Sequence, residues 1–265
     1  MRSIRVMSLY SGSSGNAFLI TTPAGAFLID AGKSARRLCQ SLAEVGVAPE
    51  SLRAIFLTHE HNDHTSALSV FLKHHPIPVH LPEECSYRLR EDASIAPCLC
   101  PHPLQYAVEL DGVKIHSFAT PHDSAASVGY HFEIPLSEEK CFRFGYATDM
   151  GYVTKTVKEA LTGCDAVVLE SNHDPDMLQT GPYPYYLKNR IASRRGHLSN
   201  GESALLASSL YASGTRCFML AHLSAENNTP DLALDEYVGA LGDQQARICV
   251  AHPEEITELP LEVLL

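Results

Sequence analysis

The sequence predicts an α/β fold, and three observations support that prediction. Short apolar runs typical of buried strands recur along the chain and alternate with stretches that have the apolar spacing of amphipathic helices. The chain has 265 residues, of which 45% are hydrophobic, so it can build one large α/β domain or two small ones. Several apolar runs end on a histidine or an aspartate, and strand ends of one sheet system can converge on one cleft.

The composition indicates which partners and which cellular compartment to expect. The formal net charge of −11 argues against non-specific binding of nucleic acid or anionic membrane over the whole surface, although a local basic patch is compatible with it. The eight cysteines are scattered and lie mostly in apolar runs, which favours reduced thiols over a disulfide framework. The first residues lack the apolar core of a signal peptide, and no apolar run is as long as a membrane span. We therefore expect a cytoplasmic protein with no membrane partner.

The N-terminal part is expected to form strands, a hairpin and one helix. The hairpin turns about Pro-Ala-Gly at residues 23–25, and the helix has its apolar residues on one face. The expected elements are a strand at 4–9, a loop of small residues at 11–16, hairpin strands at 17–22 and 26–30, and a helix at 34–45. Asp30 closes an apolar strand, where a carboxylate is costly unless it is hydrogen-bonded. It could cap the following helix or accept a hydrogen bond from a metal-binding histidine, and we favour the second role.

Residues 58–64 have the sequence Thr-His-Glu-His-Asn-Asp-His, and they carry the strongest functional signal. They follow a strand-like run at 53–57 and precede a helix expected over 65–72. His59 and His61 project to the same side of an extended backbone, and Asp63 and His64 reach a second point nearby. Imidazole and carboxylate ligands suit zinc, iron or manganese, so this stretch can serve two adjacent metal ions.

The middle of the chain adds two candidates at strand ends. The expected elements are a strand at 79–81, a helix at 82–92, a loop at 97–103, a hairpin at 108–115, strands at 127–134 and 141–148, a helix at 154–161 and a strand at 165–170. His122 lies in a loop just past a strand, the position expected for a third histidine ligand. Asp149 closes another apolar strand, and its two oxygens can bridge two cations. As a cap for the helix at 154–161 it would be loosely placed.

The C-terminal part contains one irregular basic stretch and then regular elements. Residues 179–196 interleave tyrosines with lysine and arginine, so they could stack on nucleotides and pair with phosphates, or form a solvated helix face. Both interpretations stay open at this point. Ser199 and Glu202 form a capping box for a helix at 201–211. A strand at 216–221 ends at His222, and a helix at 231–241 and the final strand at 246–251 follow.

The spacing His59-x-His61-x-Asp63-His64 after a strand resembles the metal motif of the metallo-β-lactamase fold superfamily. Within it, the small-residue loop at 11–16 and Gly-His-Leu-Ser-Asn at 196–200 resemble the YycJ/WalJ group of nucleases. The resemblance covers nearly the whole chain. It implies a four-layer αββα sandwich, with two mixed sheets inside and helices outside. It also implies a single domain over 1–265, because the 73 positions between Asp149 and His222 leave no room for a β-CASP insertion.

The resemblance further implies a dinuclear metal site. It implies two divalent ions per chain, with zinc expected on isolation and manganese as an alternative working metal. The implied ligands are His59, His61 and His122 for one ion, Asp63, His64 and His222 for the other, and Asp149 as the bridge. Two such ions can turn one water into hydroxide and polarise the bond that it attacks. In this scheme Asp63 is also catalytic, and Asp30 accepts a hydrogen bond from a ligand histidine.

Three features favour a phosphodiester as the substrate. Asp149 keeps a hard oxygen ligand between the ions, where a cysteine would resemble the β-lactamases. His197 resembles the histidine that protonates the leaving oxygen in related phosphodiesterases. Six polar residues could bind phosphate oxygens: Ser13, Ser14, Asn16, Ser224, Asn227 and Asn228.

The expected function is therefore a DNA exonuclease or another nuclease, with nucleic acid, DNA in the first place, as the partner. A small-molecule or cyclic phosphodiesterase is one alternative. A thioesterase or lactonase is a second, and it shares the metal motif but has no need of His197. A metal-binding scaffold without activity is the third, and the complete ligand set argues against it.

Overall fold

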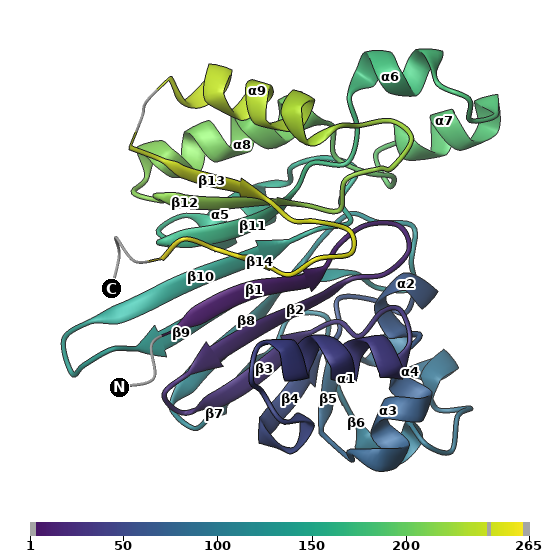
Figure 1. Cartoon of the computed structure of the whole chain (residues 1–265), viewed down its shortest axis with the longest axis vertical. Coiled ribbons are helices and arrows are strands. Elements are labelled where there is room, and N and C mark those ends of the chain that lie inside the picture. Colours follow the sequence, from purple (N-terminus) through teal and green to yellow (C-terminus); the bar gives the residue numbers. More distant parts are fainter. Residues whose placement is uncertain (1–3, 243–244, 262–265) are drawn as a thin grey trace.

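The computed structural model describes residues 4–242 and 245–261, and they form two β-sheets packed face to face with helices on both outer faces (Figure 1). This arrangement is the four-layer αββα sandwich that the sequence resemblance implied, so the expected fold class is confirmed.

The first sheet has seven strands in the order β14-β1-β2-β3-β4-β5-β6. Its strands are β1 (Arg5–Tyr10), β2 (Ala17–Thr22), β3 (Gly25–Ile29), β4 (Leu52–Phe56), β5 (Val79–Pro82), β6 (Leu99–His102) and β14 (Thr257–Glu258). Neighbours from β14 to β3 are antiparallel, whereas β3 to β6 are parallel. Parallel strands run in one direction, so the chain leaves β3 and β4 at the same edge of the sheet.

The second sheet repeats this plan in the order β13-β12-β11-β10-β9-β8-β7. Its strands are β7 (Ala107–Leu110), β8 (Val113–Ala119), β9 (Val128–Pro135), β10 (Cys141–Ala147), β11 (Ala166–Glu170), β12 (Cys217–Ala221) and β13 (Arg247–Val250). β10 to β13 are parallel and β7 to β10 are antiparallel. The ends of β10, β11 and β12 therefore lie side by side.

Helices cover the outer face of each sheet (Figure 1). The first sheet carries α1 (Ala35–Glu44), α2 (Asn62–Thr65), α3 (Leu68–His74) and α4 (Glu83–Leu89), and the short helices η1 (Pro49–Ser51) and η2 (Ala96–Cys98) lie in its connections. The second carries α5 (Lys155–Leu161), α8 (Asn200–Ala212) and α9 (Pro230–Leu241), while α6 (Pro175–Thr180) and α7 (Tyr185–Ile191) stand at one corner. Among the described residues, no helix combines the length and the apolar character needed to cross a bilayer.

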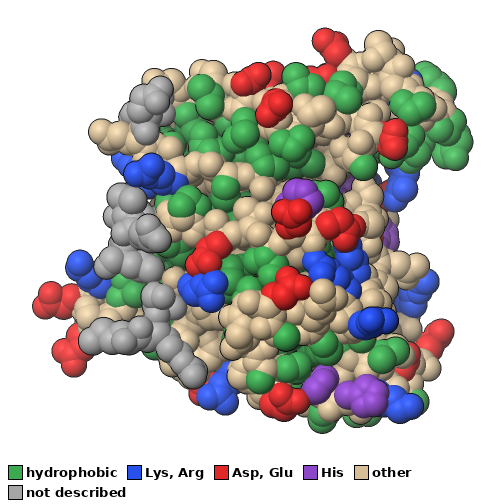
Figure 2. Space-filling model, viewed as in Figure 1, with side chains coloured by type: hydrophobic (Ala, Val, Ile, Leu, Met, Phe, Trp, Pro, Cys, Tyr) green, Lys and Arg blue, Asp and Glu red, His purple; other side chains and the backbone are tan. Residues whose placement is uncertain are grey.

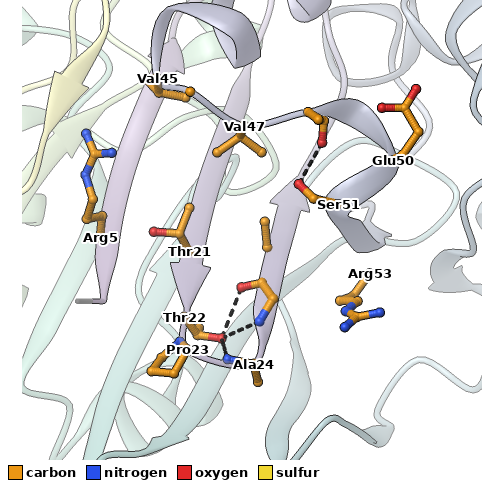
Figure 3. Close-up of a pocket in the computed structure, with 14 residues that line it drawn as sticks. Arg5, Thr21, Thr22, Pro23, Ala24, Val45, Val47, Glu50, Ser51 and Arg53 are labelled. Carbon is orange, nitrogen blue, oxygen red and sulfur yellow. Dashed lines mark hydrogen bonds between the residues drawn. The ribbon is translucent and has the colours of Figure 1, made fainter. Parts of the chain in front are cut away.

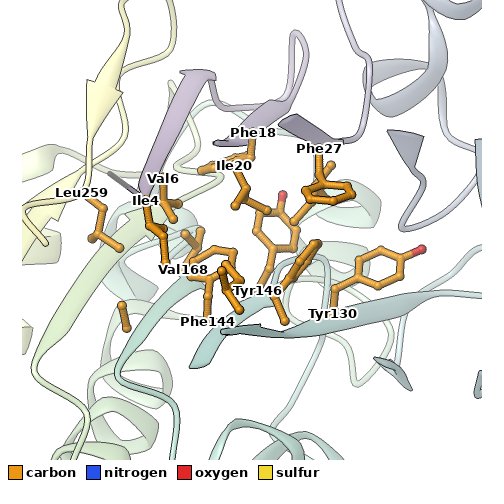
Figure 4. Packing of buried hydrophobic residues seen from close by; sticks show 14 of the residues in the cluster. Ile4, Val6, Phe18, Ile20, Phe27, Tyr130, Phe144, Tyr146, Val168 and Leu259 are labelled. Atoms are coloured by element: carbon orange, nitrogen blue, oxygen red, sulfur yellow. The ribbon is translucent and has the colours of Figure 1, made fainter. Parts of the chain in front are cut away.

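Alternating side chains along the strands build three separate apolar layers. In β2, Phe18 and Ile20 enter the layer between the sheets, whereas Leu19 packs with the helices of the first sheet. From the opposite sheet, Phe144 and Tyr146 of β10 enter the same central layer (Figure 4). The rings of Phe18 and Tyr146 meet edge to face at 4.9 Å between centroids. This packing holds the two sheets, and therefore their functional ends, in fixed relation.

Most of the expected elements are confirmed to within a few residues, including the hairpin of β2 and β3 and the cap of α8 at Ser199. The expected loop at 97–103 is wrong, because η2 and β6 occupy it. Its prolines suggested a loop, but β6 is an edge strand, where proline is tolerated. The helix expected at 65–72 is split into α2 and α3, and 179–196 contains α7. β13 was expected to be the last strand, but β14 follows it.

A hollow of about 760 Å³ lies at the turn between β2 and β3 and the connection from α1 to β4 (Figure 3). Its two arginines are already paired, Arg5 with Glu258 and Arg53 with Asp111. None of the candidate metal ligands lines it. The candidate ligands lie instead at the ends of the strands.

Candidate metal centre

Polar side chains from both sheets meet where the strands end. Six strands each deliver a histidine or a carboxylate within three residues of their last residue. These residues are Asp30 after β3, His59 after β4, His122 after β8, Asp149 after β10, Glu170 at the end of β11 and His222 after β12. All six are buried. Buried groups of this kind require partners, so their mutual contacts define the site.

The backbone bends sharply at three of these positions. Asp30, Asp149 and His222 have φ values of 61°, 56° and 58°, in the left-handed region. That conformation costs a residue with a side chain about 1 kcal/mol or more. Strain of this kind persists only where the surrounding structure imposes it, and it clusters at functional sites. Here it turns three side chains into one buried cluster directly after their strands.

One group of candidate ligands consists of His59, His61 and His122. Nε2 of His59 lies 3.0 Å from Nδ1 of His61, and the ring centroid of His122 lies 4.9 Å from that of His59. Each of the three offers a nitrogen within 4.8 Å of the others. Burial, and then the nearby His64, His122 and His61, hold the pKa of His59 well below its usual value. His59 is therefore neutral, which is the state in which imidazole binds a metal.

The second group consists of Asp63, His64 and His222. Nε2 of His64 lies 3.2 Å from Oδ2 of Asp63, and Nε2 of His222 lies 3.7 Å from the same oxygen. Burial alone would lower the pKa of His222, but Asp149, Asp63 and Glu170 raise it to about 10. Carboxylates raise the pKa of His64 in the same way. The group thus attracts positive charge, which a divalent cation would supply in place of the protons.

Asp149 lies between the two groups. Its Oδ2 is 3.5 Å from Nε2 of His64, and its Oδ1 is 3.9 Å from Nε2 of His122 and 3.3 Å from Nδ1 of His222. Within the part of the chain that the structure describes, neither Asp149 Oδ2 nor His222 Nε2 has a hydrogen-bond partner. The cap of α5 is Thr154, so Asp149 does not serve as a helix cap. Buried ligand atoms without partners, set among imidazoles and carboxylates, fit divalent metal ions.

Asp30 orients one of these histidines from behind. Its Oδ2 lies 2.7 Å from Nδ1 of His64, and the carboxylate also accepts hydrogen bonds from the backbone N–H and hydroxyl of Thr58 at 2.8 and 2.9 Å. The cap of α1 is Ser34. Asp30 therefore acts on His64 and not on the helix, and it leaves Nε2 of His64 facing the cluster.

Glu170 has the same supporting position in the second sheet, and the sequence analysis missed it. Its Oε1 lies 2.7 Å from Nδ1 of His197 and 3.1 Å from Nδ1 of His222. Its Oε2 accepts the backbone N–H groups of Met150 at 2.9 Å and Leu198 at 3.2 Å. Burial would raise the pKa of this carboxyl, but His197 and His222 hold it well below its usual value. The signal was available, because Glu170 ends an apolar strand as Asp30 and Asp149 do.

His197 stands at the rim of the cluster. Its ring centroid lies 5.2 Å from that of His122 and 5.1 Å from that of His222, and its side chain is 19% exposed. Since Nδ1 faces Glu170, Nδ1 carries the proton of the neutral ring and Nε2 is the nitrogen left for a substrate. His197 can therefore exchange a proton with a molecule that enters from solvent.

The structure does not gather the six expected phosphate-binding residues at the cluster. Asn228 donates to the carbonyl oxygens of Ser171 and Asn172 at 2.8 and 3.1 Å, and the hydroxyl of Ser224 accepts the N–H of Asn227 at 3.2 Å. These three expected donors, Ser224, Asn227 and Asn228, are buried and support the loops around His222. Polar residues after a strand end suggested substrate contacts, but here they satisfy buried backbone groups.

The expected phosphate-binding residues in the glycine-rich loop after β1 differ in their exposure to solvent. Asn16 is buried, and its amide bonds both backbone groups of Gly12, with its Nδ2 3.2 Å from Nε2 of His64. It therefore ties this loop to the second ligand group. Ser13 and Ser14 are exposed and are the two expected phosphate contacts that a substrate can reach.

A family model described as a beta-lactamase superfamily domain matches residues 26–222. The exodeoxyribonuclease WalJ of Streptococcus pneumoniae is 33% identical over 231 residues, which cover 85% of this chain and 83% of that protein. The exodeoxyribonuclease YycJ of Bacillus anthracis is 31% identical over 231 residues, which cover 85% of this chain and 84% of that protein.

Solved structures share the fold at lower identity. The metallo-beta-lactamase fold protein YhfI of Bacillus subtilis has a TM-score of 0.73 at 15% identity, covering 97% of this chain and 100% of that chain. The Zn²⁺-bound PqqB of Methylobacterium extorquens has a TM-score of 0.70 at 17% identity, covering 96% and 99%. These likenesses establish the architecture alone.

Proposed function

The chain belongs to the beta-lactamase superfamily and, within it, to the family of the exodeoxyribonucleases WalJ and YycJ, and from this premise we propose that it is a metal-dependent exodeoxyribonuclease. The observation that carries the proposal is the meeting of two ligand groups around Asp149, with His197 at their rim. Hydrolysis of a phosphodiester needs positive charge beside the phosphate and a proton for the leaving oxygen, and this arrangement has a place for both.

We propose two divalent ions, zinc on isolation with manganese as the alternative working metal. The donor set of imidazole nitrogens and carboxylate oxygens supports both identities. The proposed ligands are His59, His61 and His122 for one ion, Asp63, His64 and His222 for the other, and Asp149 for both. When bound, such ions lower the pKa of a water and neutralise charge on the phosphate.

In this proposal the chain's own residues handle the proton. His197 in its protonated form gives the proton on Nε2 to the departing oxygen of the nucleotide, while Glu170 holds Nδ1 and stabilises the imidazolium. Asp30 and Glu170 keep His64 and His222 turned so that each presents Nε2 to its ion. Ser13 and Ser14 lie exposed on the loop after β1 and are proposed contacts for the phosphate.

His197 separates this proposal from the thioesterase or lactonase alternative. The thiolate that leaves a thioester needs little protonation, so such an enzyme has no need for a buried glutamate that positions a histidine at the rim. A contact of 2.7 Å between Glu170 and His197 therefore favours an alkoxide leaving group, such as the sugar oxygen of DNA.

The proposal also covers organisation and location. We propose one catalytic domain over the whole chain, without a β-CASP insertion, because the ligands are spread from His59 to His222 across both sheets. We propose a cytoplasmic site of action, since all eight cysteines are free and lie in the described part of the chain.

A hydrolysis panel tests the proposal. The metal-loaded protein is given end-labelled DNA and RNA, bis-p-nitrophenyl phosphate, a thioester and a lactone, with a chelator-treated sample beside each. We expect metal-dependent release of nucleotides from DNA and slower cleavage of bis-p-nitrophenyl phosphate. Turnover of the thioester or lactone without cleavage of either phosphodiester would overturn the proposal.

A further inference from the structure

Two tyrosines on α7 are unusually exposed. Tyr185 and Tyr186 have 79% and 74% of their surface accessible, the highest values among the exposed large hydrophobic side chains of the described residues. Figure 2 shows hydrophobic side chains gathered over the corner of the molecule that α6 and α7 form in Figure 1. Apolar rings left in water favour a binding partner, because burying them is favourable.

The helix that carries these rings is connected by hydrogen bonds to the cluster of candidate metal ligands. Tyr186 and Arg190 are four residues apart, so they share one face of α7. Nε of Arg190 donates to Asp123 at 2.6 Å, beside His122, and Arg195 donates to the carbonyl oxygen of His122 at 3.1 Å. The same face of α7 therefore leads from an exposed ring, past a guanidinium, to the rim of the cluster.

The backbone that follows α7 packs tightly and holds α7 in place beside His122. Gly196 follows α7 and packs so closely that a Cβ at this position would lie 2.1 Å from the carbonyl oxygen of Ile191. Its own carbonyl oxygen lies 3.2 Å from Nδ1 of His122, and His197 comes next in the chain. The position of the tyrosines is thus fixed relative to the candidate proton donor.

Charge around α7 is opposite to that of the whole protein. Residues 175–195 contain four basic residues and one acidic residue, in a chain of net charge −11. Arg190 is paired, but its side chain is 55% exposed and keeps donors beyond Nε. Exposed rings combined with local positive charge in an acidic protein match a strand of nucleic acid, which presents bases and phosphates in alternation.

We infer that α7 is a platform for an unpaired DNA strand, whose bases stack on Tyr185 and Tyr186 while its backbone passes Arg190 toward the cluster of candidate metal ligands. This inference rests on the proposed function and refines it, because it names the substrate as a single strand or a frayed end. A duplex keeps its bases paired and stacked within itself, so it offers them to these rings only after its end has opened.

Binding, measured apart from cleavage, tests the inference. The probe is a fluorescein-labelled oligothymidylate with phosphorothioate linkages, which resists hydrolysis by the metal-loaded protein, and its affinity is read by fluorescence anisotropy. A blunt duplex of equal length serves as the comparison. Loss of stacked bases weakens binding by about tenfold or more per base, so the double variant Tyr185→Ser/Tyr186→Ser should raise Kd by at least that factor. The variant Tyr185→Phe/Tyr186→Phe keeps both rings and should bind within about threefold of wild type, which also guards against a folding defect in the serine variant.

Tyr87 provides a matched control. It is a tyrosine that is 58% exposed on α4, a helix of seven residues like α7, and Arg90 lies 5.5 Å from its ring. Tyr87→Ser should leave Kd unchanged. A serine double variant that binds the single strand like wild type would overturn the inference and leave the tyrosines to a protein partner. Equal affinity of wild type for single strand and duplex would overturn it as well.

The two proposals fail separately. Cleavage of bis-p-nitrophenyl phosphate by wild type has no stacked base and reports on the proposed function by itself. A wild-type protein that cleaves it, combined with an unaffected double variant, rejects the platform and keeps the nuclease. A wild-type protein that cleaves no phosphodiester rejects the nuclease.

Discussion

Replacing Glu170 by glutamine tests how the buried carboxylate sets two histidines at once. Oε2 accepts two backbone N–H groups, which cannot change their role, so the amide oxygen of glutamine will take that place. The NH₂ group then faces Nδ1 of His197 and Nδ1 of His222, 2.7 and 3.1 Å from the present Oε1. Because NH₂ donates, both rings must accept at Nδ1 and carry their proton on Nε2.

This tautomer is wrong for both proposed roles. At His222 the proton on Nε2 occupies the lone pair that a metal needs, and loss of such a supporting contact weakens metal binding about 10–100-fold. At His197 a neutral ring is too weak an acid for the leaving oxygen, and the loss of that acid costs roughly 10²–10⁴ in turnover. For Glu170→Gln we therefore expect a loss of at least about 10²-fold in kcat on DNA even at saturating metal.

The assay combines metal titration with turnover on DNA and bis-p-nitrophenyl phosphate. Excess metal should restore occupancy but leave the loss on DNA, and the loss should be smaller on the p-nitrophenyl substrate, whose leaving group needs little protonation. Thermal unfolding of the same sample shows whether the fold is kept. A correctly folded Glu170→Gln protein with kcat on DNA within about threefold of wild type would refute the reasoning.

Three further changes have defined outcomes. Asp149→Ala removes the oxygen atoms shared by both ligand groups, so it should abolish turnover and lower metal content. The control variant Lys158→Ala, on the exposed face of α5, should do neither. Full turnover of the Asp149 variant would contradict its role as a ligand to both ions. His197→Ala should keep both metals and lose roughly 10²–10⁴-fold in turnover on DNA but less on a p-nitrophenyl ester, and equal losses on both would point to a structural role. Burial, and then His102, lower the pKa of His80 from 6.5 to about 4 in the folded chain, so its stabilising contribution is present above about pH 6.5 and is lost as the pH falls to about 4. In urea unfolding, the free energy of unfolding of His80→Phe should fall less between pH 6.5 and pH 4 than that of wild type, by up to about 3 kcal/mol. An unchanged pH profile would contradict the lowered pKa of His80.

The candidate site was predictable from the sequence where one local rule sufficed. A polar residue that closes an apolar strand must have a partner, and this rule pointed to Asp30, Asp149 and His222 without any structure. The same rule applied to Glu170, but the sequence analysis did not single it out. Its partners, His197 and His222, are 27 and 52 residues away and meet only in the folded chain.

Other features depend on tertiary context. Residues 97–103 were expected to be a loop, yet β6 forms there, because Pro101 is tolerated in an edge strand that pairs with β5 alone. Asn228 lies in a polar loop of the kind that often binds phosphate, yet its amide donates hydrogen bonds to the carbonyl oxygens of Ser171 and Asn172. Whether a polar side chain faces substrate or backbone depends on which buried groups lack partners, and a sequence pattern does not contain that information.

Metal analysis of protein purified without chelators tests the central claim most directly, because the proposed chemistry requires two neighbouring cations. The two ligand groups that share Asp149 predict two divalent ions per chain in wild type, measured by mass spectrometry of the metals against protein concentration. A content that never exceeds one ion per chain, even after incubation with excess zinc or manganese, would contradict the account.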